Sequence, residues 1–383
     1  MRLGASGRNG RALQADRPFE DGFERAGREV ASELGERLAI VARICPWGWH
    51  RRLDAERLVE RAERAYELDP YEALWEVEAL GYRYAATSPE LEAGETPPRL
   101  PVDKLPAESL TMLHVGFGMA LARRRLAGVR GEVAAGVAVR RFLDDATRVT
   151  LPRFRNAAVE PLGVVARFEH PRRLAAIGRA LVAAAPDLEP WFWHGVGRCH
   201  LFLPSSFLPL PEASWRAARR IERDVPAGLP RRRARVGWAC GLALVHMRRA
   251  GLVAGVLARH GERIEAAPDR FADDFRDGVA HAVEVRRETT PECGELVSAF
   301  LAHRPAGGDA AERWRRLVEE PGLRALEAPL PLDETVFSRR RSAARRPAVR
   351  IVAPPRVLRP VLQPALCPVV AVRRPVSLAL SRR

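Results

Sequence analysis

The sequence lacks the features that define several common classes of protein. Its longest uncharged run, Ser109–Ala122, has only fourteen residues, whereas a helix that spans a membrane needs about 20 apolar residues. The segment Met1–Arg17 has no apolar core of the kind found in signal peptides. We therefore expect no membrane span and a cytoplasmic location.

Motifs for metals, cofactors and nucleophilic catalysis are also missing. The five cysteines form no CxxC pair, and His194, Cys199 and His200 have no zinc-site spacing. The GxG segments 116–118 and 195–197 lack the third glycine, the preceding strand and the later acid of a dinucleotide fingerprint. No Gly-x-Ser-x-Gly elbow occurs. We expect free thiols, no metal and no cofactor, while the sequence leaves open whether the protein is an enzyme.

Lysine is almost absent, because Lys104 is the only one among 63 basic residues. Twelve arginines and no acid lie between Arg339 and Arg383, so this tail carries most of the net charge of +15 and leaves +3 for the rest. Such a proline- and arginine-rich tail favours loose, salt-sensitive contact with nucleic acid. We predict no specific nucleic-acid partner.

A weak internal repeat is the main positive feature. A proline is followed 11 or 12 residues later by a small residue inside a cluster of small and apolar residues. The prolines recur about every 40 residues, a period typical of arrays of helical hairpins. The six pairs are Pro70 and Gly81, Pro106 and Gly118, Pro152 and Gly163, Pro186 and Gly197, Pro226 and Gly237 (or Pro230 and Gly241), and Pro268 and Ala280.

The spacing predicts how each unit folds. Proline disfavours a helical residue before it and suits the first turn of a new helix, so each proline indicates a turn between two helices. The small residue then lies about three turns into the second helix, where a glycine is expected only if another helix backbone comes close. We predict an all-α, solenoid-like array of antiparallel hairpins over residues 21–327, after a disordered segment 1–20 and before a disordered basic tail 328–383.

One position of the repeat is occupied mainly by ionisable residues. We call this position the slot, and it lies three residues before the aligned small residue. Its occupants are Glu78, Val115, Glu160, His194 and Asp277, with the fifth unit ambiguous. Equivalent positions of a repeat array share one face. We predict that Glu78, Glu160, His194 and Asp277 line a ligand-binding groove with Trp193, Trp75 and Phe275 in its walls. The alternative is a solvated row of charges with no ligand.

Three segments, Leu113–Arg123, Trp193–Gly197 and Phe275–Ala280, look like repeated signatures of the type aromatic-Glu-Gly-x-Gly/Ala and His-Val-Gly-x-Gly. These segments resemble the UnbL-like family, domain of unknown function 1702, whose members are encoded in enediyne polyketide cassettes. The resemblance covers about residues 20 to 325, and Ala79 and Pro161 occupy places where the family favours glycine. It implies an accessory role in specialised polyketide metabolism but no catalytic residue.

Two functions follow from the repeat and the resemblance. In the first, an accessory protein binds an apolar, polyketide-like intermediate or a biosynthetic partner enzyme in its groove. In the second, the protein is an interaction scaffold with no ligand and no catalytic role, built in the manner of tetratricopeptide arrays.

The composition of the tail leads to a test. Removal of all residues after Glu334 should leave soluble expression and cooperative unfolding unchanged, because the tail has seven prolines from Pro347 onward and no acidic residue. Denaturant unfolding of the truncated and full chains measures this. A loss of cooperativity on truncation would show that the tail packs on the body.

Overall fold

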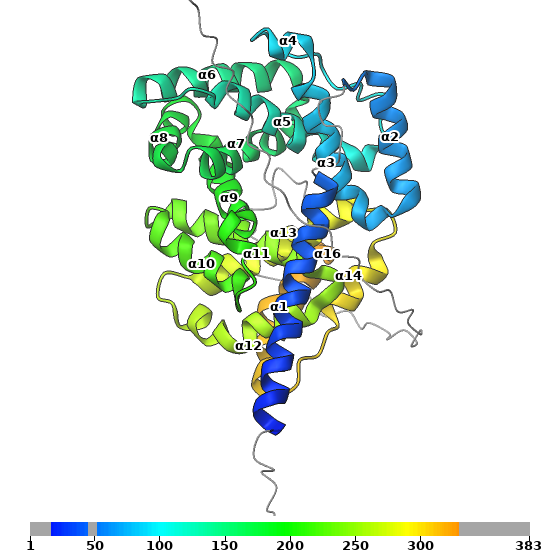
Figure 1. Ribbon diagram of the computed structural model, residues 1–383, viewed down its shortest axis with the longest axis vertical. Helices are drawn as coiled ribbons and strands as arrows, with labels where there is room; N and C mark the ends of the chain where they lie inside the picture. The colour runs from blue at the N-terminus through cyan, green and yellow to red at the C-terminus, as the bar shows by residue number, and fades with distance from the viewer. Residues whose placement is uncertain (1–16, 45–51, 329–383) are drawn as a thin grey trace, which may run out of the picture. The chain divides into compact units, whose positions relative to one another are not determined.

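The structure is a computed structural model that describes residues 17–44 and 52–328 (Figure 1). All regular structure in these ranges is helical, and they contain no strand. The predicted all-α class is confirmed. The segments predicted to be disordered are 1–20 and 328–383, and residues 1–16 and 329–383 of them lie outside the described ranges. Helix α1 begins at Arg17, within the predicted N-terminal segment.

Twelve longer helices make up most of the described chain, together with shorter helices and 3-10 turns. The longer helices are α1 (Arg17–Ile44), α2 (Ala55–Leu68), α3 (Pro70–Ala86), α5 (Leu110–Leu126), α6 (Glu132–Val149), α7 (Arg155–Glu169), α8 (Leu174–Ala184), α9 (Glu189–Cys199), α10 (Ala213–Asp224), α11 (Leu229–His246), α12 (Ala250–Ala266) and α13 (Phe271–Thr289). The shorter ones are α4 (Pro89–Glu92), α14 (Gly294–Leu301), α15 (Gly308–Trp314) and α16 (Glu320–Glu327).

Three of the six repeated prolines lie at the start of a helix or of the 3-10 turn that leads into one. Pro70 is the first residue of α3, and the Asp69 side chain before it accepts hydrogen bonds from the backbone N–H groups of Tyr71 and Glu72. Pro152 and Pro186 open 3-10 turns that lead directly into α7 and α9. The conformational restriction of proline therefore sets where these helices begin.

Six helices, α3, α5, α7, α9, α11 and α13, pack on one another in this order, and we call them the spine helices. At each contact between consecutive spine helices, a glycine lies directly over a peptide group of its neighbour, where a methyl group would overlap the neighbour's carbonyl oxygen. Such close approach is possible only without a Cβ. The glycines and the carbonyls beneath them are Gly81 and Leu113, Gly116 and Glu78, Gly118 and Ala158, Gly163 and Phe192, Gly195 and Glu160, Gly197 and Ala234, Gly237 and His194, and Gly278 and Val236.

These contacts settle the alignment of the fifth unit. Gly116 and Gly195, each one residue after a slot, lie over the slot carbonyl of another spine helix, and Gly237 lies in the same way over the carbonyl of His194. Gly237 thus follows its slot by one residue, so the fifth slot is Val236 and the aligned small residue is Ala239 rather than the predicted Gly237. Gly241, the alternative considered from the sequence, faces the Leu201 side chain instead of a helix backbone.

The two ends of the spine series meet. The Arg286 guanidinium of α13 donates to the backbone oxygen of Tyr71 in α3 at 2.7 Å. The hydroxyl of Thr111 in α5 donates to Glu288 in α13 at 2.8 Å. In an open solenoid each repeat contacts only its neighbours. The spine helices of this protein instead close on a common interior, so the solenoid-like part of the prediction is not confirmed.

One stretch, Leu229–Ala266, is long and apolar enough to cross a membrane by length and composition alone. It comprises α11 and α12 with a 3-10 turn between them, and 72% of its most apolar window is buried inside the protein. That burial is typical of core helices in soluble proteins.

The packing at the spine crossings leads to a stability prediction. Gly197→Ala should destabilise the protein by about 1 to 3 kcal/mol, because the added methyl group overlaps the backbone of α11 and forces the helices apart. Gly35→Ala is the matched control, since Gly35 is a mid-helix glycine of α1 with open space around it. The control should be neutral or stabilising by up to about 1 kcal/mol. Equal effects in urea unfolding would contradict the packing described here.

Candidate functional site

Three of the predicted slot residues meet in the interior, around an arginine that the sequence analysis did not select. Arg198 of α9 donates from Nε and Nη2 to the two carboxylate oxygens of Glu160 in α7, at 2.9 and 2.8 Å. Its Nη1 donates to the Glu78 carboxylate of α3 at 3.3 Å. His194, one turn before Arg198, places Nδ1 3.2 Å from Oε1 of Glu160.

The two carboxylates of this group differ in how strongly Arg198 stabilises their charged form. Burial raises the pKa of Glu160, but Arg198 and His194 outweigh burial and lower it to about 2. Burial is also the largest influence on Glu78 and raises its pKa, because Arg198 compensates for it less at this longer contact and the Glu160 charge adds to the effect. The Arg198 pKa is raised by the two carboxylates despite burial. The stable unit is thus the Glu160–Arg198 ion pair, with Glu78 as a more readily protonated neighbour.

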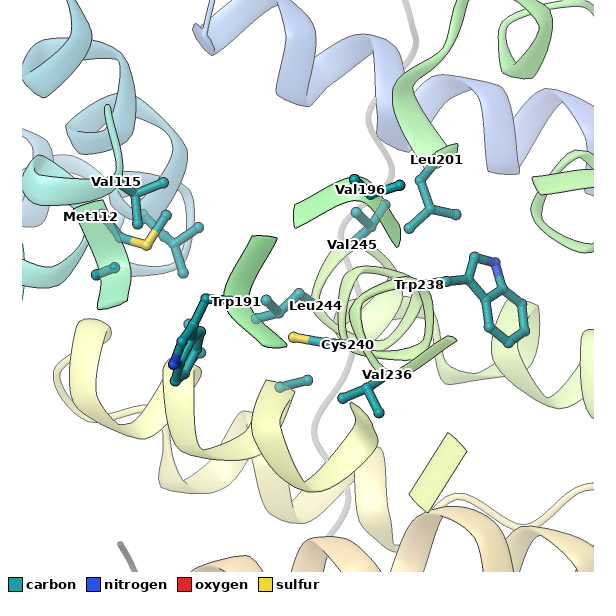
Figure 2. Close-up of a cluster of buried hydrophobic side chains, with 14 of the residues drawn as sticks. Met112, Val115, Trp191, Val196, Leu201, Val236, Trp238, Cys240, Leu244 and Val245 are labelled. Carbon is teal, nitrogen blue, oxygen red and sulfur yellow. The ribbon is translucent and has the colours of Figure 1, made fainter. Parts of the chain in front are cut away.

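The polar contacts continue from His194 toward α13. Nε2 of His194 lies 3.0 Å from Nδ1 of His281, and the Trp191 ring packs edge-on against His281 with ring centroids 6.0 Å apart. Cys240 of α11 points to the same side of its helix as Leu244, toward Trp191 (Figure 2). The donor atoms of His194, Cys240 and His281 all lie within 4.8 Å of one another, and the three residues are buried.

On the other side of Arg198 lies a mostly apolar cavity of about 390 Å³. Glu78, Arg198 and Cys199 are its buried polar lining, which we call its polar end, and the exposed pair Arg123–Glu169 lines it together with Phe168, which is 50% exposed. The remaining lining residues are Val41, Trp75, Tyr82, Met119, Val164, Val165, Phe202, Pro204 and Phe207. A larger hollow of about 670 Å³ is lined by Arg124, Arg125 and Arg141 of α5 and α6 but contains none of the slot residues.

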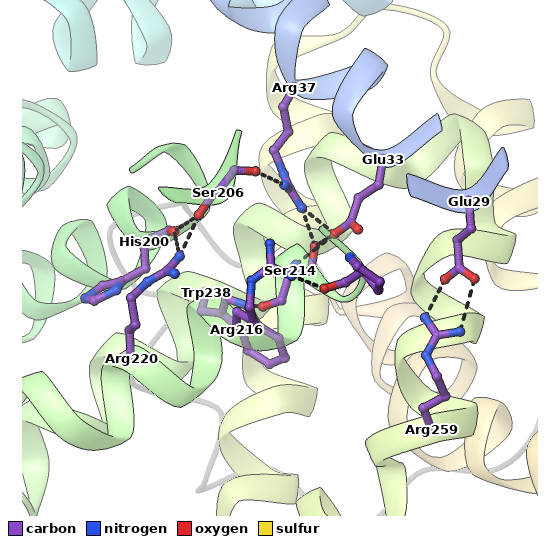
Figure 3. A network of polar contacts seen from close by, with 11 residues as sticks. Glu29, Glu33, Arg37, His200, Ser206, Ser214, Arg216, Arg220, Trp238 and Arg259 are labelled. Carbon is purple, nitrogen blue, oxygen red and sulfur yellow. Dashed lines mark hydrogen bonds and ion pairs between the residues drawn. The ribbon is translucent and has the colours of Figure 1, made fainter. Parts of the chain in front are cut away.

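Helix α1 supplies one wall of the cavity through Val41, and buried polar contacts hold this helix in place (Figure 3). Arg37 forms an ion pair with Glu33 and donates to the Ser214 hydroxyl at 2.7 Å and to the Ser206 backbone oxygen at 2.8 Å. Glu33 also accepts from the Ser214 backbone N–H at 2.8 Å. These bonds join α1 to α10 and to the turn η6 (Pro204–Ser206), whose Pro204 lines the cavity.

Two predicted site residues lie elsewhere. Asp277 is half-buried on α13 and interacts electrostatically with Arg233 and Asp274. The α13 residue that contacts His194 is instead His281, one turn later. Trp193 donates its indole N–H to Glu189 and packs edge-on against Phe192. Because Trp193 immediately precedes His194, its side chain points about 100° away from that of His194 around the helix axis. Of the predicted aromatic walls, Trp75 lines the cavity, whereas Phe275 packs on Trp238.

The residues that sequence reasoning missed share one position of the repeat. Each lies four residues after a slot, one helical turn further along the same face. Of these six residues, four line the cavity and two belong to the cluster around His194. Reading the aligned units at this second position would have found them: Tyr82, Met119, Val164, Arg198, Cys240 and His281.

No protein-family model matches the chain, and comparisons with curated proteins and with solved structures also return no match. The resemblance to the UnbL-like family therefore remains a prediction. What the structure itself defines is an all-α protein whose interior holds an apolar cavity beside a buried chain of ionisable groups.

The buried ion pair leads to a second stability prediction. Glu160→Ala should destabilise the protein by about 3 to 5 kcal/mol, because it leaves the Arg198 charge buried without its bidentate partner. Asp187→Ala is the control, since the Asp187 and Arg155 side chains are 61% and 41% exposed and their pair contributes less than about 1 kcal/mol. Unfolding midpoints in urea compare the two. A similarly small loss of stability in both variants would mean that Arg198 is not buried against Glu160.

Proposed function

We propose that this protein is an accessory binding protein that holds an elongated apolar small molecule in the cavity between α1, α3, α5, α7 and α9. The observation that carries the proposal is the combination of size and lining. The cavity of about 390 Å³ lies within the range of roughly 300–1,000 Å³ typical of ligand sites. Its walls are mainly aromatic and aliphatic, with a few polar groups among them.

The polar end indicates which ligands fit. The Arg198 guanidinium is already paired with the Glu160 and Glu78 carboxylates, so it offers no unpaired positive charge to a ligand. An anionic group would have to compete with a bidentate carboxylate, whereas a neutral hydroxyl or carbonyl group could share the outer hydrogen bonds of Glu78. The site therefore favours an apolar chain or polycycle with a neutral polar end.

The ligand class is drawn from the resemblance. A polyketide-like intermediate is long, apolar and partly conjugated, which suits the lining by Trp75, Tyr82, Phe168, Phe202 and Phe207. The association with polyketide metabolism rests on the sequence resemblance alone. The alternative, a protein–protein interaction scaffold without a ligand or a catalytic role, requires no small molecule in the cavity and is separated from the proposal by a direct binding experiment.

The test uses cis-parinaric acid methyl ester, a conjugated apolar tetraene whose fluorescence rises when water is excluded. The protein should bind it saturably at one site, with a Kd on the order of micromolar. Val164→Trp, which adds a bulky side chain to the cavity wall, should weaken binding at least tenfold. Circular dichroism and the unfolding midpoint establish that the variant is folded.

Val133→Trp is the matched control, because Val133 is 85% exposed on α6 and does not line the cavity. This variant should bind the probe like the wild type. If the wild type binds no probe, or if both tryptophan variants bind it equally, the cavity is not a ligand site and the scaffold hypothesis is favoured.

A further inference from the structure

The cluster of His194, Cys240 and His281 lies outside the cavity, because none of the three residues lines it. Each residue comes from a different spine helix, α9, α11 and α13, so no spacing in the sequence brings them together. All three are buried. A convergence of two imidazoles and a thiol from three helices in one buried place calls for a chemical explanation.

We propose that His194, Cys240 and His281 bind a divalent transition-metal ion of the zinc type, with His194 Nε2, His281 Nδ1 and Cys240 Sγ as ligands. Zinc has bonds of about 2.0–2.1 Å to imidazole nitrogen and about 2.3 Å to thiolate sulfur. Donor atoms within 4.8 Å of one another can therefore close on one ion through small side-chain rotations. Nitrogen and sulfur ligands select zinc, cobalt or copper and exclude magnesium and calcium.

The surroundings of His194 fit a metal ligand. Its Nδ1 lies 3.2 Å from the Glu160 carboxylate, which fixes the proton on Nδ1 and leaves the Nε2 lone pair directed at His281. A carboxylate behind a ligating histidine is the usual outer partner in zinc sites. Glu160 is itself held by two hydrogen bonds from Arg198, so the carboxylate cannot turn away.

The location indicates a structural ion. All three ligands are buried, and none of them lines the cavity. The ion therefore joins α9, α11 and α13 and does not contact a ligand in the cavity. Structural zinc sites are almost always four-coordinate. The cluster supplies three protein donors, so the fourth ligand is a water molecule. This proposal departs from the expectation, based on sequence spacing, that no metal is bound.

Cobalt substitution of the full-length protein tests the site. After dialysis against a chelator, Co²⁺ titration should give the d–d bands of a tetrahedral complex and a thiolate-to-cobalt charge-transfer band, both saturating at about one ion per chain. Cys240→Ser should abolish the charge-transfer band, and Cys199→Ser should retain it, because Cys199 is a buried cysteine of the cavity wall. His281→Gln should weaken Co²⁺ binding about tenfold or more.

The unfolding midpoint of the wild type supplies a readout that needs no variant, since an ion that binds only the folded state raises it. The midpoint should be higher with Zn²⁺ than after chelation. A folded wild type with no cobalt bands and no change of midpoint would overturn the proposal and leave a His194–His281 hydrogen bond beside an inert thiol. A charge-transfer band that persists in Cys240→Ser would equally overturn it.

Discussion

The close approach of helix backbones at glycine is the constraint on which the rest of this structure depends. At each contact between consecutive spine helices, a peptide group of one helix lies against a glycine of the other. This packing brings slot residues from different helices to within hydrogen-bonding distance, so that Glu160 of α7 reaches Arg198 of α9. Bulkier residues at these positions would keep the helices apart and open the ion pair to water.

The short distances also explain how polar groups are tolerated in the interior. A buried arginine is costly unless its charge is matched and its donors are hydrogen-bonded. Arg198 meets both conditions, because two carboxylates from different helices surround it. Glu160 in turn connects the arginine to His194, and His194 connects to His281. The apolar cavity and the proposed metal cluster thus lie at the two ends of a single hydrogen-bonded chain.

Much of this arrangement could be predicted from the sequence. The prolines indicated where α3, α7 and α9 begin, the spaced glycines indicated helix crossings, and the slot selected Glu78, Glu160 and His194. All of these are local patterns with a period set by helix geometry. The assumption of an open array was the weak step, because no local pattern shows that the last helix of a series returns to the first.

The errors have specific physical causes. Trp193 was predicted as an aromatic wall of the groove beside His194, but adjacent residues of a helix point in different directions. Asp277 was selected by the slot alone, although α13 reaches the interior at His281 instead. Helix α1 is held against α10 by the contacts of Glu33 and Arg37 with Ser214, and these contacts join residues more than 170 positions apart, which no repeat pattern contains.

The central claim is that residues from helices far apart in the sequence share one closed interior. A double-mutant cycle between Glu78 and Arg198, which are 120 residues apart, tests it most directly. With Glu78→Gln and Arg198→Met, the structure predicts a coupling free energy of about 0.5 to 3 kcal/mol in denaturant unfolding, whereas sites without contact add to within about 0.5 kcal/mol. Strict additivity of the two substitutions would contradict the closed interior.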